Sequence, residues 1–282
     1  PTDATRGVHV TERSEASSQH SAETTETTAT PLTPLTPLTP DEVAAFHRDG
    51  FLVVSALTSA AETVRLQAIY DQLFDGRKVF SAGDRLELAG VDSEGHETLP
   101  QILNPEKYAP ELLHIKAREH ALAIARQLLG PDTERMGDHA IRKPGRHGAA
   151  TPWHQDEAYW DPALEYDALS IWMPLQEATI ENGCMQFVAG SHRADVLPHR
   201  HISDDPSVEA LEYDGDLADL PVTACPLAPG GATVHGSRTL HYTGPNLSDS
   251  PRRAYIMGFG RPARRRVQPR DFSWHRPGPH ES

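Results

Sequence analysis

The chain has 282 residues, of which 38% are hydrophobic and 23% are charged, so it has the composition of an ordinary globular protein with a sizeable core. Its formal net charge of −14 argues against nucleic-acid binding, which usually requires a basic patch. It contains no apolar stretch long enough to cross a membrane, no apolar secretory signal and only two cysteines, so we expect a cytoplasmic protein without a disulfide scaffold.

Residues 1–40 are rich in Thr, Ser, Glu and Pro and nearly lack aromatic residues. Such a segment cannot bury enough apolar surface to offset the entropy lost on ordering, so it is predicted to be a disordered tail. The tail ends in a Thr-Pro-Leu repeat at residues 30–40, in which the prolines exclude helix and favour polyproline II. A solvated tail is the simplest interpretation, and a tether or a partner-binding arm is the alternative.

The first ordered elements are predicted to be mainly helical. Asp41 can cap a helix that ends near Gly50, and a short apolar strand follows at residues 51–54. A second helix is predicted at residues 59–74, where apolar residues recur at helical spacing. A third is predicted at residues 111–129, directly before a Gly-Pro stop signal.

From about residue 134 the predicted segments become short and are separated by Gly, Pro, Asn and Asp. Short strands with turns between them indicate an antiparallel sandwich or barrel. No second core is visible, so we expect one domain at residues 41–262, followed by a flexible tail at residues 263–282 that is rich in Arg and Pro. The predicted strands cover residues 138–142, 168–173, 185–188, 232–235, 239–242 and 253–258.

A metal-binding pattern occurs at His154-Gln155-Asp156. In an extended segment, residues i and i+2 point to the same face, so this imidazole and this carboxylate can converge on one ion. A third ligand from a neighbouring strand would complete two histidines and one carboxylate, the ligand set typical of non-haem Fe(II) oxygenases. A second copy of the pattern, at His47 and Asp49, lies at the end of a predicted helix, where i and i+2 do not share a face, so we interpret it as structural.

The third ligand is predicted to be His241, which lies in a predicted strand. Arg252 follows eleven positions later, across a turn rich in Gly, Pro, Asn and Asp. Two antiparallel strands joined by this turn place the guanidinium near His241 but deeper, where it can hold a carboxylate through two hydrogen bonds. A dicarboxylate could then bind the iron at one end and Arg252 at the other. The rival ligand is His235, but it lacks an arginine at this offset, so we expect it to be a pocket or core histidine.

Taken together, the motifs resemble the phytanoyl-CoA dioxygenase family of Fe(II)- and 2-oxoglutarate-dependent oxygenases. They occur in the order typical of the family and span about residues 41–262. One departure is Ala189, where many relatives have proline before Gly-Ser-His, and it affects a turn rather than the site. The matching stretches are residues 46–54, 143–144, 152–156, 168–175, 181–192 and 240–253.

The resemblance implies a fold that is mainly β with flanking helices, a double-stranded β-helix of the jelly-roll type. It implies that His154, Asp156 and His241 bind Fe(II) and that Arg252 holds the distal carboxylate of 2-oxoglutarate. It also implies that O2 is a second co-substrate and that succinate and CO2 are released as a substrate is oxidised. Halogenating relatives have a small residue in place of Asp156, so its retention favours hydroxylation or another oxidation. Four further residues match the co-substrate pocket of the family: Thr243, Trp172, Gln101 and His139.

Two other functions compete with the oxygenase. A cupin-like zinc or nickel protein could use the same three ligands without 2-oxoglutarate, but it would not need Arg252. A non-catalytic family member acting as a binding module is expected to have lost a ligand or the arginine, and none is lost here. The oxygenase is therefore favoured, with a small-molecule substrate such as a secondary metabolite, an amino-acid derivative or an acyl thioester.

The sequence does not indicate an oligomeric state. Substrate-contacting loops are expected around residues 76–100, 157–167 and 195–220.

Overall fold

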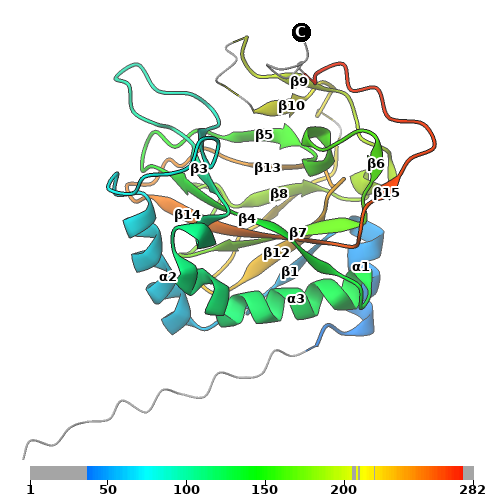
Figure 1. Cartoon of the computed structure of the whole chain (residues 1–282), viewed down its shortest axis with the longest axis horizontal. Coiled ribbons are helices and arrows are strands. Elements are labelled where there is room, and N and C mark those ends of the chain that lie inside the picture. The colour runs from blue at the N-terminus through cyan, green and yellow to red at the C-terminus, as the bar shows by residue number, and fades with distance from the viewer. Residues whose placement is uncertain (1–36, 205–207, 209, 219, 276–282) are drawn as a thin grey trace, which may run out of the picture. The chain divides into compact units, whose positions relative to one another are not determined.

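Two antiparallel sheets form the centre of the fold (Figure 1). The computed structural model describes residues 37–204, 208, 210–218 and 220–275, so the tail predicted at residues 1–40 lies outside the described residues apart from its last four. The large sheet has the strand order β1-β12-β7-β14-β4-β3-β2, and the small sheet has the order β11-β8-β13-β5. Most neighbours within a sheet are distant in sequence, so long-range pairing joins the two halves of the chain as in a jelly roll.

The elements have the following bounds. The large sheet contains β1 (Phe51–Val54), β2 (Arg85–Glu87), β3 (Pro100–Leu103), β4 (Glu134–Lys143), β7 (Ala168–Pro174), β12 (Ala232–Gly236) and β14 (Arg252–Gly260). The small sheet contains β5 (Thr151–His154), β8 (Met185–Val188), β11 (Val222–Cys225) and β13 (His241–Thr243). Two separate pairs are β9 (His199–His201) with β10 (Leu211–Tyr213), and β6 (Leu164–Glu165) with β15 (Arg264–Arg265). The helices are α1 (Pro40–Asp49), α2 (Ala60–Leu73) and α3 (Lys116–Leu129), with 3-10 turns η1 (Pro105–Lys107), η2 (Pro110–His114), η3 (Asp156–Tyr159) and η4 (Ser191–Arg193).

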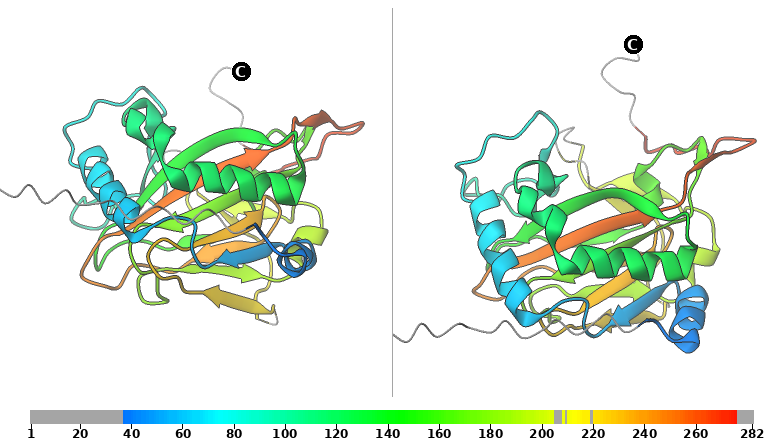
Figure 2. Two further views of the ribbon diagram at one scale, coloured as in Figure 1. Left: turned by 90° about the horizontal axis from the view of Figure 1, so that it is seen from below. Right: turned by 60° about the horizontal axis from the view of Figure 1, so that its bottom comes forward.

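Alternation along the strands separates two apolar cores. Ile171 and Met173 of β7 belong to the larger core, together with apolar residues of the helices. Trp172, which lies between them in sequence, belongs to a smaller core with residues of the small sheet. Because β7 is covered on both faces, all 7 of its residues are buried. Figure 2 shows α2 and α3 against the outer face of the large sheet, which leaves the inner face for the cavity described below.

The first two helices and the strand between them confirm the sequence prediction, with one correction at the first cap. The N-cap of α1 is Thr39 rather than Asp41: its side chain accepts from the amide of Glu42, whose carboxylate accepts from the amide of Thr39. The N-cap of α2 is Ser59, which accepts from the amide of Glu62. Pro40 follows this cap and suits the first turn of α1, where no amide donor is needed.

The predicted third helix begins at Lys116 and not at residue 111. Residues 110–114 form η2, and the backbone of Ile115 is extended. The amides of Lys116 and Ala117 donate to the two carboxylate oxygens of Glu62 on α2, each at 2.9 Å. A side chain from another helix therefore supplies the cap, and no local sequence signal could have indicated that start.

The strand predictions are correct in position and often wrong in length. The bounds of β1 and β8 match the prediction, whereas β4, β7, β12 and β14 extend beyond it. The strand predicted at residues 239–242 is β13, which begins at His241. The strands β2, β3, β9, β10 and β11 have only three or four residues each and were not predicted, although β1 and β8 are equally short.

Residues 263–275 make contacts that the sequence did not indicate. The short strand β15 pairs with β6, and Phe272 is buried. A flexible tail at residues 263–282 stays a prediction, and residues 276–282 lie outside the described part of the chain. Among the described residues, no helix has the length and apolar character needed to cross a bilayer.

Replacement of Gly50 with alanine tests how the C-terminus of α1 is held. Gly50 has a φ of 85°, and an added Cβ would lie 2.2 Å from Nδ1 of His192. We expect Gly50→Ala to lower the free energy of unfolding by about 2–4 kcal/mol, since it adds steric overlap to an unfavourable backbone conformation. Urea denaturation would measure the change.

The matched control is Gly76→Ala, because Gly76 also has a positive φ, 79°, but has no atom within 4 Å of an added Cβ. We expect this variant to lose only about 1 kcal/mol, the conformational part of the effect. Equal losses for the two variants would contradict the close packing of Gly50 against His192.

Candidate active site

Three potential metal ligands converge inside the barrel. One nitrogen of His154, one carboxylate oxygen of Asp156 and one nitrogen of His241 all lie within 4.8 Å of one another. His154 is the last residue of β5, and His241, the first residue of β13, is its direct partner across the two strands. The extended backbone predicted for this motif continues through Gln155, and Asp156 then begins the turn η3. No other such cluster of His, Cys, Asp or Glu occurs among the described residues.

Each of the two imidazoles is held in a fixed orientation. Nδ1 of His154 lies 2.7 Å from the carbonyl of Pro152, and Nδ1 of His241 lies 2.8 Å from the carbonyl of Thr239. With Nδ1–H donating to these carbonyls, each Nε2 keeps its lone pair, and the two Nε2 atoms lie 3.7 and 3.6 Å from Oδ1 of Asp156. Burial lowers the pKa of both histidines, which favours the neutral, metal-binding form.

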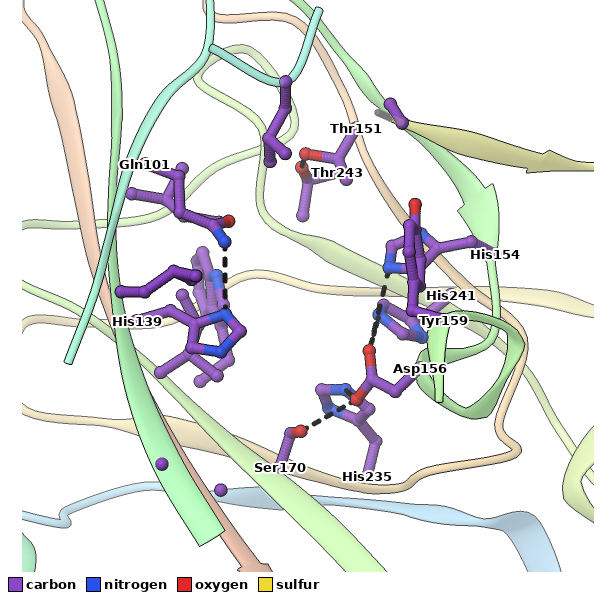
Figure 3. Close-up of a pocket in the computed structure, with 18 of the residues that line it drawn as sticks. Gln101, His139, Thr151, His154, Asp156, Tyr159, Ser170, His235, His241 and Thr243 are labelled. Atoms are coloured by element: carbon purple, nitrogen blue, oxygen red, sulfur yellow. Dashed lines mark hydrogen bonds and ion pairs between the residues drawn. The ribbon is translucent and has the colours of Figure 1, made fainter. Parts of the chain in front are cut away.

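The second oxygen of Asp156 has its own partners. Ser170 Oγ donates to Oδ2 at 2.8 Å, and Nε2 of His235 lies 3.5 Å from Oδ2 (Figure 3). Burial acts to raise the pKa of Asp156, but the neighbouring histidines outweigh it and the pKa is lowered, so the group is ionised at neutral pH. Two imidazoles and one ionised carboxylate suit a divalent iron, and they leave coordination positions free for other ligands.

Arg252 is a buried cation without an anionic partner in the described structure. Its side chain is 1% exposed, and its Nε and Nη1 atoms have no hydrogen-bond acceptor. Its guanidinium lies 5.3 Å from the centre of the Trp172 ring. Burial lowers the pKa of Arg252 to about 9, which still leaves it charged at neutral pH. Free donors on a buried cation fit the carboxylate of a bound anion, because unpaired buried charge is otherwise costly.

Lys143 lies directly opposite Arg252 across β4 and β14 and is also fully buried. Its Nζ donates to Oγ1 of Thr243 at 2.7 Å and to the carbonyls of Thr243 and Gly244 at 3.1 and 2.7 Å. Thr243 in turn donates to the hydroxyl of Thr151 at 3.0 Å. Burial, followed by the nearby Arg252, lowers the pKa of Lys143 well below its usual value. The lysine is therefore satisfied by protein oxygens, whereas the arginine is left free for a ligand.

Gln101 and His139 lie on the opposite wall of the cavity from the three potential ligands (Figure 3). They come from β3 and β4, and Nε2 of Gln101 lies 3.4 Å from Nδ1 of His139. The His139 side chain is exposed to the space of the cavity, yet it lies deep in the barrel, and burial lowers its pKa. These two neutral groups can hydrogen-bond to a bound molecule from the side opposite the metal ligands.

All eight residues predicted from the sequence line this one cavity of about 380 Å³. The predicted loops also contribute to it, through Leu86, Leu88 and Leu99, through Tyr159 and Trp160, and through Ala210. Three polar neighbours were not predicted: Ser170 on Asp156, Thr151 on Thr243 and Lys143 on Thr243. Lys143 occurs in one of the matching stretches, but nothing in its sequence context indicated burial against Thr243.

His47, Arg253 and His235 lie away from this cavity or outside the ligand cluster. The carbonyl of His47, at the end of α1, accepts from Nε2 of His192 at 3.1 Å. Arg253, which follows Arg252, faces the outside and pairs with Asp71 at 2.6 Å. His235 lines the cavity beside Asp156, and its Nδ1 has no partner among the described residues.

The comparisons with known proteins agree with this geometry. The family model for phytanoyl-CoA dioxygenase (PhyH) matches residues 46–254. The chain belongs to the phytanoyl-CoA dioxygenase family. It is 27% identical over 221 residues to a probable alpha-ketoglutarate-dependent hypophosphite dioxygenase of Stutzerimonas stutzeri, covering 74% of each chain. It is also 27% identical over 259 residues to the ectoine dioxygenase of Sphingopyxis alaskensis, covering 84% of this chain and 80% of the relative.

A solved structure is more similar in sequence. EvdO2 from Micromonospora carbonacea var. aurantiaca is 42% identical, with a TM-score of 0.74 over 85% of this chain and 97% of EvdO2, and it has also been solved in complex with 2-oxoglutarate. The predicted family and the double-stranded β-helix are thereby confirmed. As a member of this family, the chain is a non-haem dioxygenase that depends on Fe(II) and 2-oxoglutarate, and the cupin-like alternative without 2-oxoglutarate turnover is not favoured.

Comparison of His241→Ala with His235→Ala tests which histidine is the third ligand. We expect His241→Ala to abolish measurable Fe(II) binding, because it removes one of the three predicted ligands. We expect His235→Ala to weaken binding only about tenfold, as is typical for a group that hydrogen-bonds a ligand. Anaerobic equilibrium dialysis would measure both. Equal loss of Fe(II) in the two variants would contradict the assignment.

Proposed function

We propose that the protein oxidises a small molecule, most simply by hydroxylation, at Fe(II) held by His154, Asp156 and His241. Arg252 binds the distal carboxylate of 2-oxoglutarate, beside Thr243 and Trp172. The observation that carries this proposal is a buried arginine with free donors in the same cavity as the His-Asp-His cluster. A metal-binding protein without 2-oxoglutarate has no use for that arginine.

When bound, Fe(II), 2-oxoglutarate and O2 supply an oxidative decarboxylation that yields succinate and CO2 and oxidises a bond of the substrate. The residues of the chain position the reactants. Arg252 pairs with one carboxylate, and the Lys143–Thr243–Thr151 network fixes the hydroxyls beside it. Asp156 occupies the position that is open in halogenating relatives, which supports hydroxylation or another oxidation as the outcome.

The cavity walls indicate what kind of substrate fits. Apolar side chains form much of the cavity wall, including Leu86, Leu103, Met136 and Ile256, with Gln101 and His139 as neutral hydrogen-bonding groups. Among the described lining residues, Arg252 and Asp156 carry the formal charges, and both already have a role. We therefore propose that the part of the substrate that enters the cavity is uncharged. Gln101 and His139 can contact either this substrate or the co-substrate.

The proposal includes a catalytic domain at residues 41–262 of a cytoplasmic enzyme, with an N-terminal tail at residues 1–40 and a C-terminal tail at residues 263–282, of which the described part packs against the domain. The family match at residues 46–254 lies within the proposed domain. The two cysteines, Cys184 and Cys225, are free and buried, as expected for a reducing compartment. With a net charge of −14, neither a nucleic acid nor an anionic membrane surface is proposed as a partner.

Release of succinate tests this function. Incubated with Fe(II), 2-oxoglutarate and O2, the wild type should form succinate, slowly alone and faster with its substrate, as measured by NMR. Arg252→Gln should raise the KM for 2-oxoglutarate about a hundredfold, since loss of one partner from a buried charge pair costs about 3 kcal/mol.

The matched control is Arg253→Gln, which removes the neighbouring arginine on the outer face, where it pairs with Asp71. This variant should keep the wild-type KM. No succinate above a protein-free blank, or equal effects of the two variants, would contradict the proposed function.

A further inference from the structure

Glu157, the residue after Asp156, has a buried carboxylate that lies outside the lining of the cavity. Its amide donates to the carbonyl of Ser237 at 3.1 Å, and Ser237 Oγ donates to its Oε1 at 2.8 Å. Ser237 lies on the connection between β12 and β13, which carry His235 and His241. Glu157 therefore joins the turn η3 to the segment that leads to the third potential ligand.

Arg270 reaches the same carboxylate from the C-terminal part of the chain. Its Nη1 lies 2.9 Å from Oε2 of Glu157, and the two side chains are only 7% and 1% exposed. The other cation near Glu157 is Arg238, at 3.7 Å and 40% exposed, so it is a weaker partner. Arg270 also pairs with Asp195. The pair between Glu157 and Arg270 is thus the main charge compensation of this buried carboxylate.

Neighbours of Arg270 hold the backbone of the same turn. Nε1 of Trp274 donates to the carbonyl of Ala158 at 2.9 Å, and Nε2 of His275 lies 3.0 Å from the same oxygen. The carbonyl of Trp274 is in turn 2.8 Å from Nε2 of His201. The turn η3 therefore has two sides: Asp156 and Tyr159 line the cavity, whereas Glu157 and Ala158 are held from outside by residues 270–275.

We propose that Glu157 and Arg270 are positioning residues for the metal centre, and that residues 270–275 brace the turn that carries Asp156. The inference rests on the proposed function, in which Asp156 binds iron. A four-residue 3-10 turn has few internal hydrogen bonds, so its position depends on contacts from outside. Removal of Arg270 leaves Glu157 buried with only a half-exposed partner, and the turn must shift to relieve this, which moves Asp156 relative to His154 and His241.

The experiment measures the Kd for Fe(II) of full-length protein by anaerobic equilibrium dialysis with saturating 2-oxoglutarate. Arg270→Gln and Glu157→Gln should each raise this Kd about tenfold, the usual scale for residues that orient metal ligands. The double variant, which removes both buried charges, should recover most of the loss, because the charges that lose a partner, Asp195 and Arg238, are exposed to solvent. The control Arg264→Gln removes an exposed arginine of the same segment, 3.7 Å from Glu165, and should keep the wild-type Kd.

The unfolding midpoint of the metal-free protein separates positioning from general stability. A lower midpoint with an unchanged Kd for Fe(II) would overturn the inference, and so would a double variant as weak as Arg270→Gln alone. If Arg270→Gln does not fold, Arg270→Lys should show a smaller rise in the Kd for Fe(II). A wild-type Kd in both Arg270→Lys and Glu157→Gln would contradict the proposal that these residues position the turn. Failure of the wild type itself to bind Fe(II) would overturn the proposed function, whereas normal binding by every variant would overturn this inference alone.

Discussion

The structure depends on keeping one ionised carboxylate inside an apolar barrel. An unpaired buried charge is costly: Ser170 donates to Oδ2 of Asp156, with His235 beside it, whereas Oδ1 faces the Nε2 atoms of His154 and His241, where a bound cation would compensate the charge. These partners come from both sheets, so they meet only if β13 pairs with β5 in one register and β12 pairs with β7 in another. The candidate metal site therefore depends on the strand register, because a shift by a single residue would turn these side chains to the opposite face.

The two buried basic residues Lys143 and Arg252 differ in their hydrogen-bond partners. Lys143 and Arg252 are opposite each other and both buried, but the lysine has three protein oxygens as acceptors and the arginine has free donors. The donors of Arg252 are thus free to bind a carboxylate, and no protein carboxylate pairs with them in the described structure. The cluster of His154, Asp156 and His241 lines the same cavity as Arg252, together with Trp172, Thr243 and apolar residues of β2 and β3. In the proposed function, the charged groups hold the co-substrate and the apolar residues contact the substrate.

Sequence patterns predicted the parts of this arrangement that are local. His154 and Asp156 share one extended segment, and His241 and Arg252 are joined by one turn. The helices α1 and α2 were also predicted from local patterns, apart from the cap of α1. What could not be predicted depends on contacts between distant segments. Glu62 caps α3 from another helix, Ser170 holds Asp156 from β7, and Arg270 reaches Glu157 across more than a hundred residues of sequence. Several strands of three or four residues also escaped prediction, since pairing partners stabilise them rather than their own composition.

The central claim is that one cavity holds Fe(II) and 2-oxoglutarate together. It is tested most directly by anaerobic titration of the wild type with Fe(II) and then with 2-oxoglutarate, recorded by visible absorption. Chelation of the iron by 2-oxoglutarate should give a weak charge-transfer band that saturates at one equivalent of each per chain. No band from folded protein that has bound Fe(II) would contradict the account and would favour a metal protein without 2-oxoglutarate.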